Sequence, residues 1–195
     1  MKRIFDVVIA FFGLLVFSPL LAVVAVLIKL DSGGPVFFRQ ERIGRRFKSF
    51  CIYKFRTMVK DAQERGGVIT SGEDARNTRI GRILRKAKID ELPQLFNVLK
   101  GEMSFVGPRP EVKKYVELFR HDYEEILKIR PGITDLASLK YRNEALILGQ
   151  AKDPDETYIK MVLPDKIRLA KEYLRCSTFT FDLALIFKTL LRMVL

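Results

Sequence analysis

The apolar stretch VVIAFFGLLVFSPLLAVVAVLI, Val7–Ile28, decides the fold of this chain. Ser18 is its one polar interruption, and Gly13 and Pro19 also lie within it. With about twenty residues, the stretch has the length of a helix that crosses a bilayer. It is too long for the apolar part of a signal peptide, and Lys29-Leu30-Asp31 offers no small-residue cleavage site after it. The sequence therefore predicts a membrane anchor.

Basic residues lie on both sides of this anchor. They are Lys2 and Arg3 before it, and Lys29, Arg39, Arg42, Arg45, Arg46 and Lys48 after it. Because basic flanks mark the cytoplasmic side of a membrane segment, the two ends favour the same side. The pattern favours a re-entrant hairpin that enters the membrane and returns. A kinked helix that spans the bilayer stays the alternative.

Ser18 and Pro19 lie near the middle of the anchor. A proline removes one backbone hydrogen bond and clashes with the preceding helical turn, so the helix kinks there. The Ser18 hydroxyl can then bond a carbonyl that the proline leaves free. Each arm has about ten to twelve residues, or roughly 15–18 Å, which reaches one leaflet. We therefore predict a helix-break-helix membrane element over residues 1–34.

Residues 35–195 are predicted to form one small domain of the α/β class, rich in helix. The turn cluster Asp31–Pro35 ends the membrane element. Short strands are predicted at 35–40 and 47–55 around a basic loop, and helices at 57–64, 80–87, 111–128, 154–173 and 179–195. The last helix is strongly apolar but carries Lys188 and Arg192 on one face. It is either an amphipathic helix in the membrane interface or a core helix with a solvated stripe.

The composition narrows the class of partner. The chain has a formal net charge of +12, which favours polyanions: nucleic acid, anionic lipid headgroups or phosphorylated substrates. Cys51 and Cys176 lie far apart, and His121 is the single histidine. A zinc site or a disulfide framework is therefore not expected, and His121 is interpreted as a surface residue.

The stretch Ile89–Gly101, IDELPQLFNVLKG, contains the candidate reactive residues Asp90 and Glu91. Leu92, Leu95, Phe96 and Leu99 follow the spacing of one helical face. Since proline is tolerated in the first turn of a helix, the helix is predicted to begin near Asp90. Its free amides would suit a carboxylate or a bound phosphate. Taken alone, the pattern favours the simpler reading, in which Asp90 only caps the helix.

The surroundings of this pair change the interpretation. Arg82, Arg85, Lys86 and Lys88 precede it, and Gly107-Pro108-Arg109-Pro110 follows. Pro108 and Pro110 restrict the backbone on either side of Arg109, which suits rigid recognition of a phosphate. Two carboxylates among several cations make a poor nucleic-acid surface but fit a site for Mg²⁺ and a diphosphate.

These motifs together resemble the bacterial sugar transferases known as monotopic phosphoglycosyl transferases, in their small, single-domain branch. The matching stretches are Lys2-Arg3 with Asp6, Ser18-Pro19, Lys54-Phe55-Arg56-Thr57-Met58, Leu84-Arg85-Lys86, Asp90-Glu91-Leu92-Pro93-Gln94, Gly107-Pro108-Arg109-Pro110 and Pro131-Gly132-Ile133-Thr134. They occur in the family's order and cover nearly the whole chain.

The resemblance implies a fold and a reaction. It implies a re-entrant helix kinked at Ser18-Pro19, with residues 35–195 as a catalytic domain on the cytoplasmic face of the bacterial inner membrane. It also implies a Mg²⁺-dependent transfer of a sugar phosphate from a UDP-sugar to polyprenol phosphate, expected to be undecaprenyl phosphate. Asp90 would form a covalent phosphosugar intermediate with release of UMP, and Glu91 would hold Mg²⁺.

The remaining expectations concern substrate contacts. Arg85 and Arg109, with Pro108 and Pro110 beside the latter, match the family's phosphate-binding positions. Arg56 is taken as a substrate contact and Lys54 as structural. Arg142-Asn143 keeps part of a family pattern, so Arg142 is a further candidate, although Asp135–Ser138 departs from it. The transferred sugar is not assigned, and a homodimer is left open. The alternative is a membrane-anchored basic binding or scaffold protein without catalysis.

Overall fold

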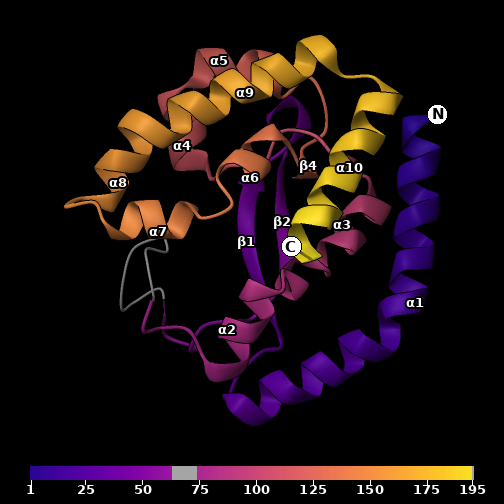
Figure 1. Cartoon of the computed structure of the whole chain (residues 1–195), viewed down its shortest axis with the longest axis vertical. Helices are drawn as coiled ribbons and strands as arrows, with labels where there is room; N and C mark the ends of the chain where they lie inside the picture. Colours follow the sequence, from indigo (N-terminus) through magenta and orange to yellow (C-terminus); the bar gives the residue numbers. More distant parts are fainter. Residues whose placement is uncertain (63–73, 195) are drawn as a thin grey trace.

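A computed structural model describes residues 1–62 and 74–194 of the chain. Helix α1, Lys2–Asp31, runs along one side of the molecule and then turns beneath it (Figure 1). The turn follows from Pro19, which cannot donate a hydrogen bond to the carbonyl of Leu15, four residues earlier. The Ser18 hydroxyl donates to that carbonyl instead, at 2.8 Å. The prediction that the Ser18 hydroxyl bonds the carbonyl left free by Pro19 is confirmed.

Both arms of α1 pack against the rest of the chain. In the first arm, Ala10 is fully buried against Leu95, Val98 and Met103. In the second arm, Val24 and Ile28 form a cluster with Phe55 and Leu84, among others. The bent helix therefore cradles the domain, and its bend is fixed by packing as well as by Pro19.

The first turn of α1 is anchored by polar contacts. The Lys2 ammonium donates to Tyr173 Oη at 2.9 Å and lies 2.7 Å from Asp182 Oδ2. The buried Asp6 carboxylate accepts a hydrogen bond from the Phe105 amide at 3.2 Å. These contacts join the beginning of the chain to elements that are more than ninety residues away, as the Phe105 bond spans 99 residues.

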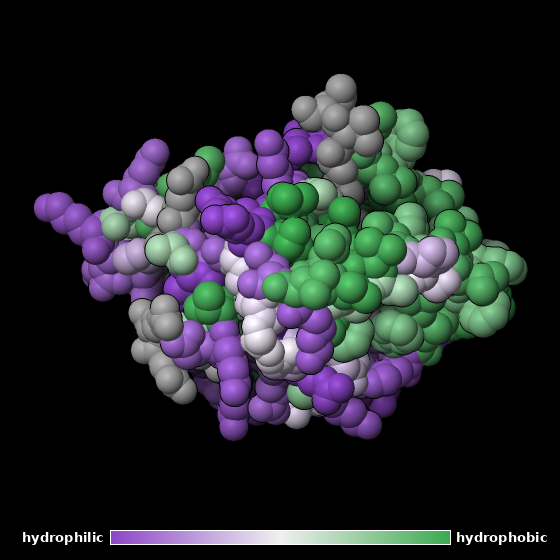
Figure 2. Space-filling model, turned by 90° about the horizontal axis from the view of Figure 1, so that it is seen from below, coloured by the Kyte–Doolittle hydropathy of each residue, from purple (hydrophilic) through white to green (hydrophobic). Residues whose placement is uncertain are grey.

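The outward faces of α1 and α10 are apolar. Figure 2 shows a continuous apolar surface on one side of the molecule and hydrophilic side chains on the other. Exposed side chains on α1 include Phe11, Phe12, Leu15, Val16, Val23, Val26 and Leu30. Within the described residues, α1 is the one helix long and apolar enough to cross a membrane. A surface of this size is typical of a protein that contacts a membrane or another apolar surface.

Two small sheets form the centre of the domain. Strands β1, Phe37–Ile43, and β2, Ser49–Phe55, make an antiparallel hairpin in which Phe37 pairs with Phe55 and Ile43 with Ser49. Strands β3, Ser104–Val106, and β4, Gly132–Thr134, pair in parallel. The predicted strands at 35–40 and 47–55 correspond to the hairpin, whose first strand continues into the expected basic loop. The second sheet was not predicted.

Helices cover these sheets. They are α2 Arg79–Lys86, α3 Gln94–Lys100, α4 Lys113–Leu118, α5 Arg120–Ile126, α6 Leu136–Lys140, α7 Glu144–Gly149, α8 Pro154–Thr157, α9 Leu163–Cys176 and α10 Phe179–Val194. A single π turn, Tyr158–Val162, joins α8 to α9. The main core lies between α4, α5 and α9, around Tyr115, Tyr123, Leu163 and Ile167.

Two helix predictions are wrong in part. The expected helix over 111–128 is broken at Phe119, whose backbone leaves the helical region with φ −121° and ψ 38°. The break lets Tyr115 on α4 and Tyr123 on α5 enter the same core. The expected helix at 57–64 is absent over 57–62, where Met58 instead forms a bridge with Asn77. Its last two residues lie outside the described residues.

Helix α10 has an inner and an outer face. Asp182 and Leu185 are buried, whereas Leu183, Phe187 and Leu190 are exposed. The helix lies beside the first arm of α1 in Figure 1. Because its outer face is largely apolar, the structure favours the interfacial interpretation of this helix over a core helix with a solvated stripe.

Candidate functional site

Asp90 and Glu91 lie in a short 3-10 turn, Ile89–Glu91, between α2 and α3. Lys88 adopts a left-handed conformation, with φ +57°, and turns the chain after α2. Helix α3 begins at Gln94, with Pro93 at its N-cap position, so the prediction that the helix starts near Asp90 is wrong. The side chain of Asp90 therefore does not cap α3, and the capping interpretation is also wrong.

Asn97 holds α3 against strand β2. Its side-chain oxygen accepts a hydrogen bond from the Tyr53 amide at 3.1 Å, and its amide nitrogen donates to the Cys51 carbonyl at 2.7 Å. Asn97 is fully buried, whereas Phe96 is 42% exposed although it belongs to the predicted apolar face. This docking brings Lys54, the residue after Tyr53, to the turn that carries Glu91.

Glu91 is bound by two cations from different parts of the fold. Its Oε1 atom lies 2.7 Å from Lys54 Nζ on β2 and 2.5 Å from Arg109 Nη2 in the segment after β3. Burial acts to raise the pKa of this carboxyl, but Arg109 and Lys54 together hold it well below its ordinary value. Glu91 is therefore ionised at neutral pH.

Asp90 has a different environment from its neighbour. Its residue is 8% exposed, and its buried Oδ1 atom has no hydrogen-bond partner among the described residues. Burial raises the pKa of Asp90, while the positive charge of Lys54 opposes the rise. An unpartnered buried carboxylate is costly for a fold, which makes Asp90 a candidate for a chemical role.

The segment around Arg109 is fixed through its backbone. The Arg109 amide donates to Asp135 Oδ2 at 3.0 Å, and the Pro108 carbonyl accepts from the Gly132 amide at 3.0 Å. The Pro110 carbonyl accepts from Arg42 at 3.1 Å. These bonds fix the backbone on both sides of Arg109, and its guanidinium donates to Glu91.

A cation-rich cavity opens beside Glu91 and Arg109. The residues that line it come from α2, the 3-10 turn, β4, α6, α7, α9, α10 and the loops between them: Lys86, Lys88, Glu91, Arg109, Ile133, Thr134, Ala137, Ser138, Leu139, Tyr141, Arg142, Glu144, Lys166, Thr189 and Arg192. Six of these side chains are cationic and two are carboxylates, a balance that suits a phosphorylated ligand. The cavity wall includes Glu91, and Asp90 lies directly before it in the chain.

The predicted substrate contacts divide between two places. Arg109 and Arg142 line the cavity. Arg85 donates to Asn77 Oδ1 at 3.1 Å and is not part of the wall. Arg56 donates to the Ser32 and Gly33 carbonyls at 2.7 and 2.9 Å, so it binds the two backbone carbonyls that directly follow α1. The structure thus places Arg56 beside the end of α1 and Lys54 on Glu91, and the substrate contact assigned to Arg56 stays a prediction.

Several cavity residues were not predicted. Ser138, Glu144, Lys166, Thr189 and Arg192 come from segments that are distant in sequence. Ser138 belongs to the segment Asp135–Ser138, where the sequence departs from the family pattern. Thr189 and Arg192 lie on α10, where Arg192 donates to the Leu139 carbonyl at 2.6 Å. The apolar helix at the end of the chain therefore also forms part of the cavity.

The donor set near Asp90 fits Mg²⁺ only as a site completed by substrate. Across the ranges 1–62 and 74–194, no group of three or more His, Cys, Asp or Glu side chains is arranged to hold a metal ion. Mg²⁺ commonly binds one or two carboxylates together with phosphate oxygens and water. The Glu91 carboxylate at the cavity wall, next to the buried Asp90, matches that mode.

The comparisons with known proteins find similar sequences over nearly the whole chain. Residues 1–195 match the family model for bacterial sugar transferases. A UDP-N-acetylgalactosamine-undecaprenyl-phosphate N-acetylgalactosaminephosphotransferase of Aeromonas hydrophila is 40% identical over 97% of this chain, which corresponds to 42% of that protein. A UDP-glucose:undecaprenyl-phosphate glucose-1-phosphate transferase of Escherichia coli is 37% identical over 98% of this chain and 40% of its own length. This chain thus spans less than half the length of these two relatives.

A third relative is matched over most of its own length as well as most of this chain. The exopolysaccharide production protein ExoY of Rhizobium meliloti is 37% identical over 97% of this chain and 83% of its own length.

Proposed function

This chain belongs to the bacterial sugar transferase family, and from that premise we propose that it transfers a sugar 1-phosphate from a UDP-sugar to polyprenol phosphate. One observation carries the proposal. A buried Asp90 carboxylate without a partner adjoins Glu91, which two cations hold at the wall of a cation-rich cavity. The names of the Aeromonas and Escherichia relatives, which act on undecaprenyl phosphate, support this acceptor.

The first step uses Asp90 as the nucleophile. A carboxylate oxygen of Asp90 attacks the phosphorus next to the sugar, and the bond from that phosphorus to the bridging oxygen breaks. UMP leaves with the bonding electron pair, and the phosphosugar remains on Asp90 as an acyl phosphate. The positive charge of Lys54 favours the ionised form of Asp90 that this step requires. Dividing the transfer through a covalent intermediate lets one site serve two unlike substrates in turn.

The second step regenerates the carboxylate. A phosphate oxygen of the polyprenol phosphate attacks the same phosphorus, and the bond to Asp90 breaks. The product is polyprenyl-diphosphate-sugar. Arg109 lies at the cavity wall beside this centre, where its charge stabilises the oxygens that become more negative in each transition state. Glu91 would hold Mg²⁺, which when bound neutralises diphosphate charge and polarises its phosphorus–oxygen bonds.

The reaction is tested by supplying the purified protein with UDP-sugars, Mg²⁺ and polyprenol phosphate and measuring UMP. We expect UMP with at least one sugar donor, together with a lipid product that carries the sugar. A broad panel of UDP-sugars that yields no UMP would contradict the proposed function. Omission of the lipid should leave one stoichiometric release of UMP, because the phosphosugar then stays on the enzyme.

We also propose that α1 is re-entrant and that the domain lies on the cytoplasmic face of the membrane. The bend at Pro19, the Ser18–Leu15 hydrogen bond and the basic flanks support this arrangement. The apolar outer faces of α1 and α10 would lie in the membrane, and the cavity would open near the lipid phosphates.

The topology is tested with single cysteines in a variant without Cys51 and Cys176. One cysteine precedes Met1, and the other replaces Gly33, where a side chain meets no atom within 4 Å. Both should react with a membrane-impermeant maleimide in inverted vesicles and neither in right-side-out vesicles. Labelling of the two positions from opposite sides would refute the re-entrant arrangement and support a spanning helix.

A further inference from the structure

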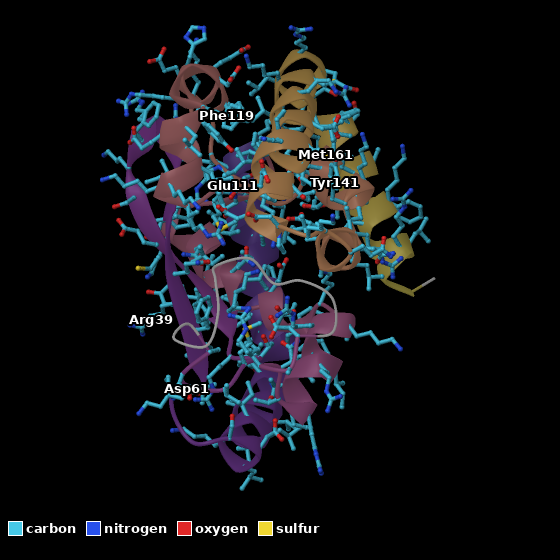
Figure 3. All side chains as sticks on the ribbon, turned by 90° about the vertical axis from the view of Figure 1, so that its left-hand side faces the viewer. Arg39, Asp61, Glu111, Phe119, Tyr141 and Met161 are labelled. Carbon is cyan, nitrogen blue, oxygen red and sulfur yellow. The ribbon has the colours of Figure 1, made fainter. Side chains whose placement is uncertain are left out.

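One part of the cavity wall is unlike the rest. Helices α6, α7 and α9 contribute Ser138, Glu144 and Lys166 to it, and Tyr141 directly follows α6. Glu144 is a hydrogen-bond acceptor in a wall that is otherwise rich in cations. An acceptor suits a hydroxyl group of a ligand better than a phosphate, which carries acceptor oxygens of its own. Figure 3 shows Tyr141 on the side of the molecule where α9 and α10 lie.

Glu144 is held in place through one of its two oxygens. Its Oε2 atom lies 2.6 Å from Lys166 Nζ, whose side chain is 11% exposed. Lys166 also donates to Tyr158 Oη at 3.3 Å, and that hydroxyl donates to the buried Glu111 at 2.6 Å. Glu111 lies between β1 and α9 in Figure 3. A buried network thus fixes Lys166, and Lys166 fixes Glu144.

The other oxygen of Glu144 remains available. Its Oε1 atom accepts no hydrogen bond from any side chain or amide in the part of the chain that the structure describes. A carboxylate with one oxygen anchored and the other free is a preorganised acceptor for a hydroxyl group, because little side-chain freedom is lost on binding.

Ser138 supplies a second polar group to the same wall. Its Oγ atom is buried and has no partner within the described ranges. Its amide donates to Asp135 Oδ1 at 2.6 Å, which fixes the first turn of α6 and hence the position of this side chain. A buried hydroxyl normally finds a hydrogen-bond partner, and here a ligand in the cavity can supply it.

We propose that Glu144 and Ser138 form the subsite that recognises hydroxyl groups of the donor and so determine which donor is used. This inference rests on the proposed function, since it assigns a role within the same cavity. The group that this subsite recognises is a hydroxyl, which belongs either to the transferred sugar or to the ribose of the nucleotide. Glu144 accepts the hydroxyl proton, and Ser138 bonds the same group or its neighbour.

The test measures UMP release by the full chain against donor concentration for Glu144→Gln, Ser138→Ala and Glu172→Gln. The last is a matched control, because Glu172 lies on α9 with an exposed ion pair to Arg168 and is outside the cavity wall. We expect KM for the preferred UDP-sugar to rise about tenfold or more in Glu144→Gln, with kcat changed little. Ser138→Ala should show a smaller rise, and Glu172→Gln none.

UDP-sugars that lack one hydroxyl identify which hydroxyl Glu144 contacts. In one set of donors, each member lacks a single hydroxyl of the transferred sugar. In the second set, 2′-deoxyuridine replaces uridine. The rise in KM should vanish with the donor that lacks the contacted hydroxyl, and the set in which this happens identifies sugar or ribose. An equal rise for every donor, or no rise at all, would overturn the assignment.

Two further measurements keep the outcomes distinct. Thermal unfolding reports whether Glu144→Gln is folded; if it is not, Ser138→Ala carries the test, because removal of an unpartnered hydroxyl should not destabilise the protein. Isothermal titration of the wild type and variants with UDP-sugar and UDP measures binding without turnover. Weaker binding in Glu144→Gln without UMP release by the wild type would support the subsite and refute the transferase reaction. Unchanged binding would refute the subsite.

Discussion

Asp90→Asn is expected to abolish UMP release, with a fall in rate on the order of 10⁴-fold or more. The amide has nearly the same shape as the carboxylate but is not a nucleophile, so no acyl phosphate can form. Incubation with a UDP-sugar in the absence of lipid, followed by intact-mass measurement, should reveal a phosphosugar adduct on the wild type and none on the variant. The fold should persist, since the change removes a buried carboxylate whose Oδ1 atom has no partner.

The matched control is Asp122→Asn. Asp122 lies on α5 and pairs with Lys171 at 2.7 Å, away from the cavity wall. Its variant should keep both the UMP release and the adduct. A binding or scaffold protein would be indifferent to Asp90→Asn, and an adduct that persists in this variant would show that another residue is the nucleophile.

Arg109→Ala is expected to reduce the rate of UMP release by roughly 10²- to 10³-fold, the usual effect of removing one charge-stabilising donor. The arginine lies at the cavity wall and bonds Glu91, so its loss removes a positive charge from the diphosphate region and leaves Glu91 paired with Lys54 alone. Steady-state kinetics with the preferred donor give the size of the loss. Arg109→Lys should recover part of the rate, because it restores the charge without the bidentate geometry.

Arg45→Ala provides the control for this change. Arg45 is exposed and donates to the Lys128 carbonyl at 2.9 Å, so its variant should keep the wild-type rate. A wild-type rate in Arg109→Ala would mean that the guanidinium only supports the fold, and the unfolding temperature would then be the property that changes.

Features governed by neighbouring residues were predicted best from the sequence. The bend at Pro19 and its relief by Ser18 depend on residues within one helical turn, and the structure confirms that hydrogen bond. The hairpin strands follow from local alternation and turn residues, and their positions were predicted to within a few residues. The prediction of a helix start at Asp90 was wrong because left-handed Lys88 places a separate 3-10 turn before α3.

Features that depend on distant contacts were predicted poorly. Lys54 and Arg56 are two residues apart on one strand, yet one bonds Glu91 and the other closes the end of α1. The sequence contains no signal that separates the two residues, because they differ only in which distant residues their side chains contact in the folded chain. The same reason explains why Lys166 and Glu144 were missed as cavity residues.

The contact of Lys2 with Asp182 has a consequence for the order in which the protein matures. The ion pair joins two residues that lie 180 positions apart in the sequence. Helix α1 therefore leaves the ribosome long before α10 exists, and nascent chains fold from the N-terminus onward. During most of the synthesis of these residues α1 has no α10 to pack against, so the contacts between the two helices form only after the residues between them have been made. Completion of α10 then joins the beginning of α1 to the helix that also carries Thr189 and Arg192 of the cavity wall.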